Sequence, residues 1–149
     1  MLQNGAAWFL VADGRRARVL VEARRGATLE ELAEWKAELG PDDQYDPRDR
    51  PPRAFDRKGG ARHAMDKGRN LHEMEEAKFL KRLAARIGEA EKQGAFDHLV
   101  IAAPPRALGL LREYLPAPAL ARVRAETAKD VLDETQPQLR ARLGALLRA

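Results

Sequence analysis

Residues 56–87 read DRKGGARHAMDKGRNLHEMEEAKFLKRLAARI, a basic stretch with glycines that runs directly into a stretch with helical periodicity. Asn70 can cap the free amides of a helix start, and Glu73 follows three residues later, as in a capping box. Apolar residues then recur every three to four positions, at Leu71, Met74, Ala77, Leu80, Ala84 and Ile87. We therefore predict an amphipathic helix over Leu71–Gln93, ended by Gly94, with the remaining elements built around it.

The positive charge of the chain is concentrated just before this predicted helix. Residues 48–69 contain eight Lys or Arg and three Asp, a net charge of +5, while the whole chain carries +4. The rest of the chain is therefore about neutral. Such a concentration indicates binding to phosphate or other polyanions, and a solvated basic loop is the alternative interpretation. We predict a basic, Gly-rich loop at 41–69, and its prolines, glycines and like charges predict poor order in Pro41–Lys67 without a partner.

Composition limits the class of protein. With 149 residues, 44% hydrophobic and 34% charged, the chain is expected to form a single soluble domain over 1–149. The chain contains neither cysteine nor serine, which excludes disulfides, thiolate metal sites and serine or cysteine nucleophiles. The N-terminus has no basic lead-in and Asp13 interrupts its apolar run, so we expect a cytoplasmic protein with no membrane contact.

The N-terminal region predicts strands. The continuous apolar run Ala6–Ala12 is typical of a buried strand, and Ala17–Val21 is typical of a returning one. Asp13-Gly14 between them predicts a two-residue hairpin turn, in which glycine would accept a positive φ. Residues Thr28–Leu39 fit both a helical stripe and a strand alternation, so periodicity leaves this segment open.

The second half alternates strands and helices. Asp97–Ala103 predicts a strand, and Pro104-Pro105 starts a helix with Leu108, Leu111 and Leu115 on its buried face, stopped by Pro116 and Pro118. Ala121–Lys129 alternates as a strand does. Thr135 and Pro137 begin a last helix that carries Leu139, Leu143, Leu146 and Leu147. This order predicts an α/β fold with a mixed sheet.

Few residues suggest catalysis. His72 and Glu76, four apart on the predicted helix, resemble part of a zinc motif, but the sequence shows no third ligand, so we predict no metal and no cofactor. His63 lies in the basic stretch and can act as a general base or contact phosphate. His98 opens a strand and is interpreted as structural. Gly59-Gly60 lacks the strand, lysine and helix of a phosphate-binding P-loop.

Several motifs together resemble the bacterial host attachment protein family, a bacterial branch of the archaeal–eukaryotic release factor superfamily. The resemblance covers nearly the whole chain. It rests on residues 8–14 (WFLVADG) with 17–20 (ARVL), 59–65 (GGARHAM), 72–80 (HEMEEAKFL) and 124–130 (RAETAKD). It implies a release-factor middle-domain, ribonuclease H-like fold: a mixed sheet with an N-terminal antiparallel meander and three flanking helices. It also implies that Thr28–Trp35 is the third strand of that meander.

The resemblance also implies a function. Release factors carry Gly-Gly-Gln on a loop before a long helix, and the glutamine positions water at the peptidyl-tRNA ester. This chain has Gly59-Gly60 there and Ala61 in place of the glutamine, and an alanine side chain cannot hydrogen-bond water. The resemblance therefore implies a module that binds the ribosome or tRNA without hydrolysing peptidyl-tRNA.

Three functions follow as hypotheses. In the first, RNA backbone is bound by the basic stretch, through Arg57, Lys58, Gly59, Gly60, Arg62, His63, Lys67 and Arg69. In the second, the chain is a hydrolase or nuclease with catalytic residues from His63, Asp66, His72 and Glu73. In the third, it is a host-attachment or cell-surface interaction factor that acts through protein partners.

Overall fold

The computed structural model describes residues 5–44 and 61–147, with side chains described for 5–44 and 70–147. The elements are, in chain order, β1 (Ala7–Ala12), β2 (Arg16–Glu22), β3 (Leu29–Glu31), β4 (Ala37–Glu38), α2 (Ala61–Lys92), β5 (His98–Ala102), α3 (Pro105–Tyr114), α4 (Ala117–Leu120), β6 (Val123–Thr127) and α5 (Gln136–Leu147). Two short 3-10 turns, Ala33–Trp35 and Pro41–Asp43, flank β4. In this part of the chain, no helix is long and apolar enough to cross a membrane.

The strands form one mixed sheet, as predicted. In the described residues its order is β3-β2-β1-β5-β6, and β4 also pairs with β2. β2 is antiparallel to β1, β3 and β4, whereas β1, β5 and β6 run parallel. All six residues of β1 are buried, because helices cover both faces of the sheet at this central strand.

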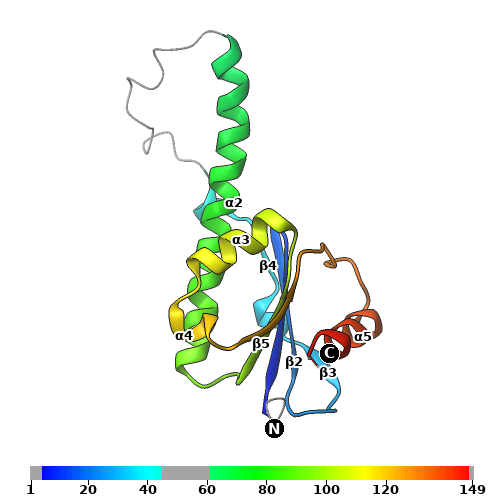
Figure 1. Cartoon of the computed structure of the whole chain (residues 1–149). Helices are drawn as coiled ribbons and strands as arrows, with labels where there is room; N and C mark the ends of the chain where they lie inside the picture. Colours follow the sequence, from blue (N-terminus) through cyan, green and yellow to red (C-terminus); the bar gives the residue numbers. More distant parts are fainter. Residues whose placement is uncertain (1–4, 45–60, 148–149) are drawn as a thin grey trace.

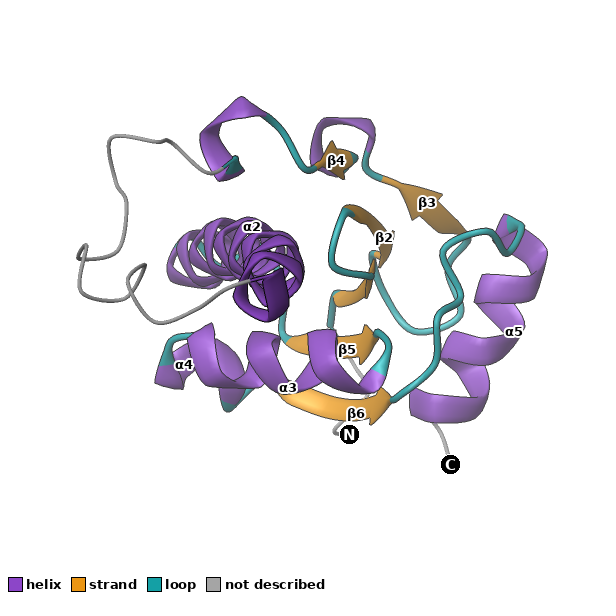
Figure 2. Ribbon diagram, turned by 90° about the horizontal axis from the view of Figure 1, so that it is seen from above, coloured by secondary structure: helices purple, strands orange, loops and turns teal. Residues whose placement is uncertain are grey.

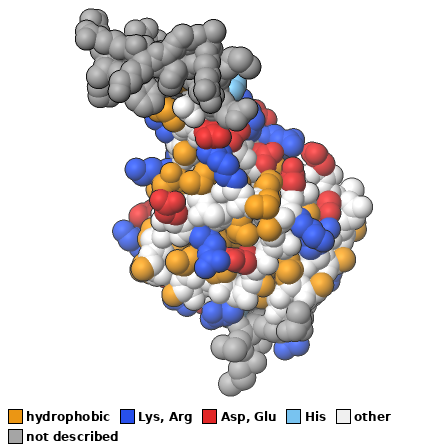
Figure 3. Space-filling model, turned by 45° about the horizontal axis from the view of Figure 1, so that its top comes forward, with side chains coloured by type: hydrophobic (Ala, Val, Ile, Leu, Met, Phe, Trp, Pro, Cys, Tyr) orange, Lys and Arg blue, Asp and Glu red, His pale blue; other side chains and the backbone are white. Residues whose placement is uncertain are grey.

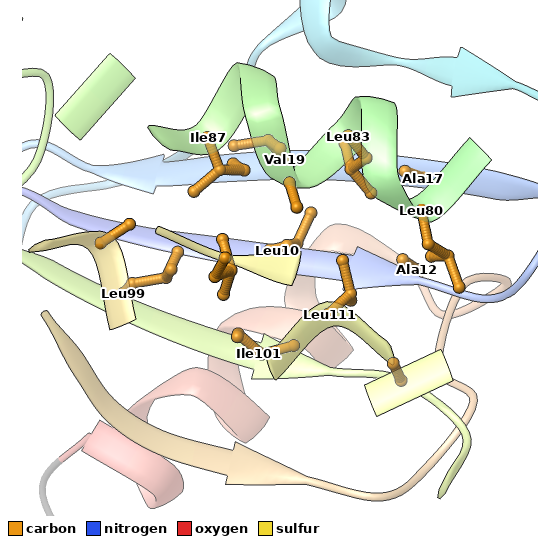
Figure 4. Close-up of a cluster of buried hydrophobic side chains, with 14 of the residues drawn as sticks. Leu10, Ala12, Ala17, Val19, Leu80, Leu83, Ile87, Leu99, Ile101 and Leu111 are labelled. Carbon is orange, nitrogen blue, oxygen red and sulfur yellow. The ribbon is translucent and has the colours of Figure 1, made fainter. Parts of the chain in front are cut away.

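The larger core lies between the sheet and the pair α2 and α3. Figure 4 shows Leu10 and Val19 of the strands beside Leu83 and Ile87 of α2, and Ile101 of β5 beside Leu111 of α3. The buried α2 residues Leu80, Leu83, Ala84 and Ile87 follow the three-to-four spacing that places side chains on one helix face. This packing fixes the second half of α2 against the sheet.

The opposite face of the sheet carries a smaller core under α5. Phe9 and Val11 of β1 point to this side, where they meet Leu139 and Leu143 of α5. Thr135 begins α5 as predicted: its Oγ1 accepts a hydrogen bond from the Gln138 amide at 3.4 Å. The result is a three-layer α/β/α arrangement, in which α5 lies alone on its side (Figure 2).

The predicted N-terminal hairpin is confirmed, but its turn is shifted by one residue. Asp13 and Arg16 pair through a backbone hydrogen bond of 3.0 Å, so Gly14 and Arg15 form the turn. The Asp13 carboxylate accepts the amides of Arg15 and Arg16, both at 2.7 Å. The expected positive φ is wrong, since among the described residues only Gly5, Gly26 and Gly94 have one. A side-chain hydrogen bond therefore holds this turn.

The segment that periodicity left open is mainly extended. β3 adds the third strand of the N-terminal meander, as the resemblance implied, and it pairs antiparallel with β2. The strand is only three residues long because the 3-10 turn Ala33–Trp35 follows it. This turn places Trp35 edge-on against Trp8, with ring centroids 5.1 Å apart, which explains the helix-like spacing of its apolar residues.

The predicted boundaries of the long helix and of the basic loop are wrong. α2 begins at Ala61 rather than Leu71, so Asn70 lies inside a helix and does not cap it. Residues 61–69 include strong helix formers such as Ala61, Ala64 and Met65, whose propensity outweighs the local signal of Asn70. At the other end of the predicted loop, Pro41–Asp43 forms a 3-10 turn rather than loop, and the poor order of Pro41–Lys67 without a partner stays a prediction. The remainder, residues 45–60, lies outside the described residues.

A fourth helix was not predicted. Pro116 and Pro118 were expected only to stop α3, yet Ala117–Leu120 forms the short α4, which follows Pro116 and contains Pro118. Proline is compatible with the first turn of a helix because the amide it lacks has no helical partner there. Pro116 packs tightly on α2 at Gly88, where an added Cβ would lie 2.6 Å from the Pro116 ring.

We predict that Gly68→Ala stabilises the protein by about 0.5–1 kcal/mol, since glycine in a helix interior has a large entropic cost relative to alanine. The structure places Gly68 within α2. Urea unfolding would measure the stability, and amide exchange would show whether the protected residues include those near position 68. A loss of stability would contradict a helical start at Ala61.

Candidate nucleic-acid interface

The structure extends the predicted RNA-binding residues onto a helix. Figure 1 shows the first turns of α2 projecting beyond the sheet. Arg62, His63, Lys67 and Arg69 belong to this projecting part of the α2 backbone, although their side chains lie outside the described ones. Arg57, Lys58, Gly59 and Gly60 lie outside the described residues altogether. Of the predicted catalytic residues, His72 and Glu73 are exposed on α2.

Gly14, Glu76 and Arg106 meet at the base of the projecting part of α2, and we call this cluster the Glu76 junction. Arg106 of α3 donates from Nη1 to Glu76 Oε1 at 3.0 Å, and from Nη2 to the Glu73 carbonyl at 3.4 Å. From the hairpin, Gly14 approaches so closely that an added Cβ would lie 2.7 Å from the Glu76 carboxyl carbon. Three segments distant in the sequence therefore meet at one carboxylate.

The Glu76 junction changes the interpretation of the His72/Glu76 pair. Because Glu76 turns toward Arg106, its carboxylate is neutralised by a guanidinium rather than directed to a metal with His72. Among the described residues, no group of three His, Asp or Glu side chains is arranged to hold a metal ion. Asp66 and His63 belong to the stretch whose side chains are not described.

Sequence reasoning missed Arg106. The residue lies in the first turn of α3, where the helix dipole disfavours a cation and the Glu76 carboxylate offsets this effect. β1 and β5 are parallel, so Asp13 at the end of β1 and Arg106 after β5 lie at the same edge of the sheet. Parallel pairing of these two strands was the signal that could have placed Arg106 beside the hairpin.

We predict that Gly14→Ala destabilises the protein by about 1 kcal/mol, because the new Cβ forces Glu76 away from Arg106. The side chains of Arg106 and Glu76 are 47% and 26% exposed, which keeps the expected cost small. In the Glu76→Ala background, Gly14→Ala should cost little further stability, since the carboxylate that it would displace is already gone. A double-mutant cycle by urea unfolding measures the coupling. Strictly additive costs would contradict the Glu76 junction.

Asp43, near the start of the predicted basic loop, is bound by Arg82, which lies closer to the end of α2 than Glu76 does. Arg82 donates to both oxygens of the Asp43 carboxylate, at 3.1 and 2.6 Å, and the Gly40 amide donates a third hydrogen bond at 3.0 Å. Burial opposes ionisation of Asp43, but these hydrogen bonds and nearby cations outweigh it and hold the pKa of the carboxyl below its ordinary value. Asp43 thus fixes the chain beside α2 just before residues 45–60.

Residues 45–60 connect two points that lie far apart along α2, the Asp43–Arg82 contact and the start of the helix at Ala61. Position 61 starts α2, and Arg82 is 21 residues further on, about 30 Å along the axis at the helical rise. Residues 45–60, with five Lys or Arg and three Asp, therefore connect a point near the sheet to the tip of the projecting helix. On the face seen in Figure 3, the described surface near the start of α2 mixes Lys and Arg with Asp and Glu.

The chain resembles known proteins over most of its length. Residues 8–143 match a family model described as "Protein required for attachment to host cells". An archaeal translation termination factor, aRF1, is 14% identical with a TM-score of 0.49, covering 94% of this chain and 38% of that one. A structure described as an archaeal protein is 15% identical with a TM-score of 0.51, covering 96% and 36%. The chain thus spans somewhat more than a third of either structure, and no curated protein matches it.

Proposed function

The chain belongs to the family of proteins required for attachment to host cells, and from this premise we propose that it is a single-domain module that binds the ribosome or tRNA. One observation carries the proposal. The +5 charge of residues 48–69 falls on the segment that leads into α2 and on the projecting start of α2 itself. A basic stretch along a protruding helix is a suitable contact for RNA phosphates, because clustered Lys and Arg neutralise them.

The proposed contact is with RNA backbone rather than with bases. Its cations are Arg57, Lys58, Arg62, Lys67 and Arg69, and His63 adds a further donor. The segment has two aromatic neighbours, Tyr45 and Phe55, which gives little base-stacking capacity. Co-sedimentation with ribosomes across a salt series tests the proposal, because phosphate contacts make affinity fall steeply with salt. Binding that does not change with salt would contradict it.

A second candidate is favoured by the description of the family itself. A role in attachment is compatible with a protein partner, bound through the mixed-charge surface around the base of α2. Such an interface depends on shape and apolar contacts more than on counterion release. Capture of one protein partner at high salt, without RNA, would favour this candidate over ribosome or tRNA binding.

We predict that the native protein does not release peptide from peptidyl-tRNA. Ala61 stands where release factors carry the water-positioning glutamine, and removing such a group lowers a rate by about 100- to 1,000-fold. A peptide-release assay with ribosomal complexes measures this, with an active release factor as the positive control. Ala61→Gln tests whether the missing side chain alone accounts for the difference. Efficient release by the native protein would contradict the prediction.

Loss of any turnover on His63→Ala would support the hydrolase hypothesis instead.

A further inference from the structure

A polar cavity lies on the α5 side of the sheet, away from the projecting helix. Its volume is about 300 Å³, at the lower end of the range for sites that bind small ligands. The floor comes from β2 and β4, and the wall from the connection between β6 and α5. Eight residues line it: Arg16, Ala17, Arg18, Lys36, Ala37, Glu38, Leu132 and Asp133.

Arg18 makes the wall of this cavity rigid. Its guanidinium donates to both carboxylate oxygens of Glu31, at 3.1 and 2.7 Å, and to the carbonyls of Leu132 and Glu134, at 2.7 and 2.9 Å. These bonds tie β2 to β3 and to the connection before α5. The guanidinium of Arg18 is therefore already hydrogen-bonded within the protein, and the part of the cavity that it supports is preorganised.

Arg16 is held much more loosely than Arg18. Its Nη1 lies 3.4 Å from Asp133 Oδ1, and its Nη2 lies 3.9 Å from Asp13 Oδ2. The Asp133 side chain is 86% exposed, so little besides Arg16 restrains it. A ligand oxyanion can form shorter charge-assisted bonds, about 2.7–2.9 Å, to the same guanidinium. Asp133 thus occupies a position that a ligand phosphate or carboxylate with shorter, better aligned hydrogen bonds can take.

We propose that this cavity binds a small molecule through one phosphate or carboxylate group. Arg16 is the principal donor, because guanidinium matches both groups with two parallel hydrogen bonds, and exposed Lys36 is the second cation. Asp133 competes with the ligand and is displaced by it. Glu38, which lies opposite Arg16 in the backbone pairing of β4 with β2, contributes a second carboxylate to the lining. Two carboxylates disfavour a polyanion, so this site is distinct from the proposed RNA contact.

The test uses the full chain and two probes, inorganic phosphate and acetate, titrated at constant ionic strength. Nuclear magnetic resonance follows the arginine Nε–Hε signals and the amides of Leu132 and Asp133. We expect saturable shifts with at least one probe, and the two titrations distinguish a phosphate site from a carboxylate site. Absence of saturation with both probes would overturn the proposal.

Two variants locate the binding. Arg16→Ala should weaken the affinity about tenfold, the loss expected for a hydrogen bond to a charged group. Asp133→Asn should strengthen it about two- to fivefold by removing the competing carboxylate. Arg24→Ala and Glu30→Gln are matched controls on exposed residues and should change nothing. Equal affinity in Arg16→Ala and in the native protein would overturn the proposal, as would weaker binding by Asp133→Asn.

Discussion

Replacing Arg57, Lys58 and Arg62 together by alanine is expected to weaken ribosome or tRNA binding about 100-fold near 0.1 M salt. Each lost phosphate contact lowers the slope of log affinity against log salt by about one unit, so the slope should fall by about three. The effect is large because these residues belong to the segment 48–69, which carries a net charge of +5. Co-sedimentation or filter binding at several salt concentrations measures both quantities.

A matched control separates position from total charge. Arg24, Arg25 and Arg140 are exposed, and their replacement by alanine also removes three positive charges. Arg24 and Arg25 follow β2, at the end of the sheet opposite the start of α2 (Figure 1). This control variant should keep nearly the native affinity and salt slope. Equal losses in both triple variants would show that net charge alone drives binding and would contradict a contact centred on the start of α2.

The sheet could be predicted because its strands carry strong local signals. β1 and β5 are continuous apolar runs, and Asp13-Gly14 between two strands indicated a hairpin. Burial on both faces of a central strand leaves no room for polar residues, so sequence and structure agree there. Segment 28–39 was harder, since a three-residue strand followed by a 3-10 turn has no clear period of its own.

The start of α2 could not be predicted because its local signals conflict. Gly68 and Asn70 are typical of a loop and a helix cap, whereas Ala61, Ala64 and Met65 favour helix. Once the second half of α2 is fixed against the sheet, extension needs no new nucleus and adds one hydrogen bond per residue. Tertiary packing thus favours the longer helix, and a capping pattern alone does not show where it begins.

The candidate site depended on contacts that no local pattern contains. Glu76 meets Gly14 from 62 positions earlier and Arg106 from 30 positions later, as their residue numbers show. The sequence indicated which segment is basic, but not that α2 would project or that Asp43 would fasten the chain to Arg82. The meeting of Gly14 and Arg106 at Glu76 follows from the pairing of β1 with β5, which brings the two strand ends to one edge.

Arg18 connects three segments of the chain through four hydrogen bonds. The alternation of β2 places it on the α5 face, where its ion pair with Glu31 has side chains only 16% and 24% exposed. We expect Arg18→Ala to lower the free energy of unfolding by about 2–4 kcal/mol. The loss combines four hydrogen bonds with a half-buried carboxylate left without its cation.

Acid dependence gives this prediction a second readout. The hydrogen bond from Arg18, aided by its charge, outweighs partial burial and holds the pKa of Glu31 below its ordinary value. A carboxyl with a lowered native pKa stabilises the fold above its unfolded pKa, about 4.3, and this contribution is lost as the pH falls through the native value. The gap in stability between the native protein and Arg18→Ala should therefore narrow below about pH 4.

Arg16→Ala is the matched control, two residues away on the same strand. Its side chain is 48% exposed and its ionic contacts are 3.4 and 3.9 Å long, so its loss should cost less than about 1 kcal/mol. Arg18→Met retains part of the packing while removing the charge, which separates burial of the stem from the ion pair. Urea unfolding between pH 3 and pH 7 compares all three variants. If Arg16→Ala and Arg18→Ala cost the same, or if the gap for Arg18→Ala stays constant with pH, Arg18 does not connect β2, β3 and the approach to α5 in the way its hydrogen bonds indicate.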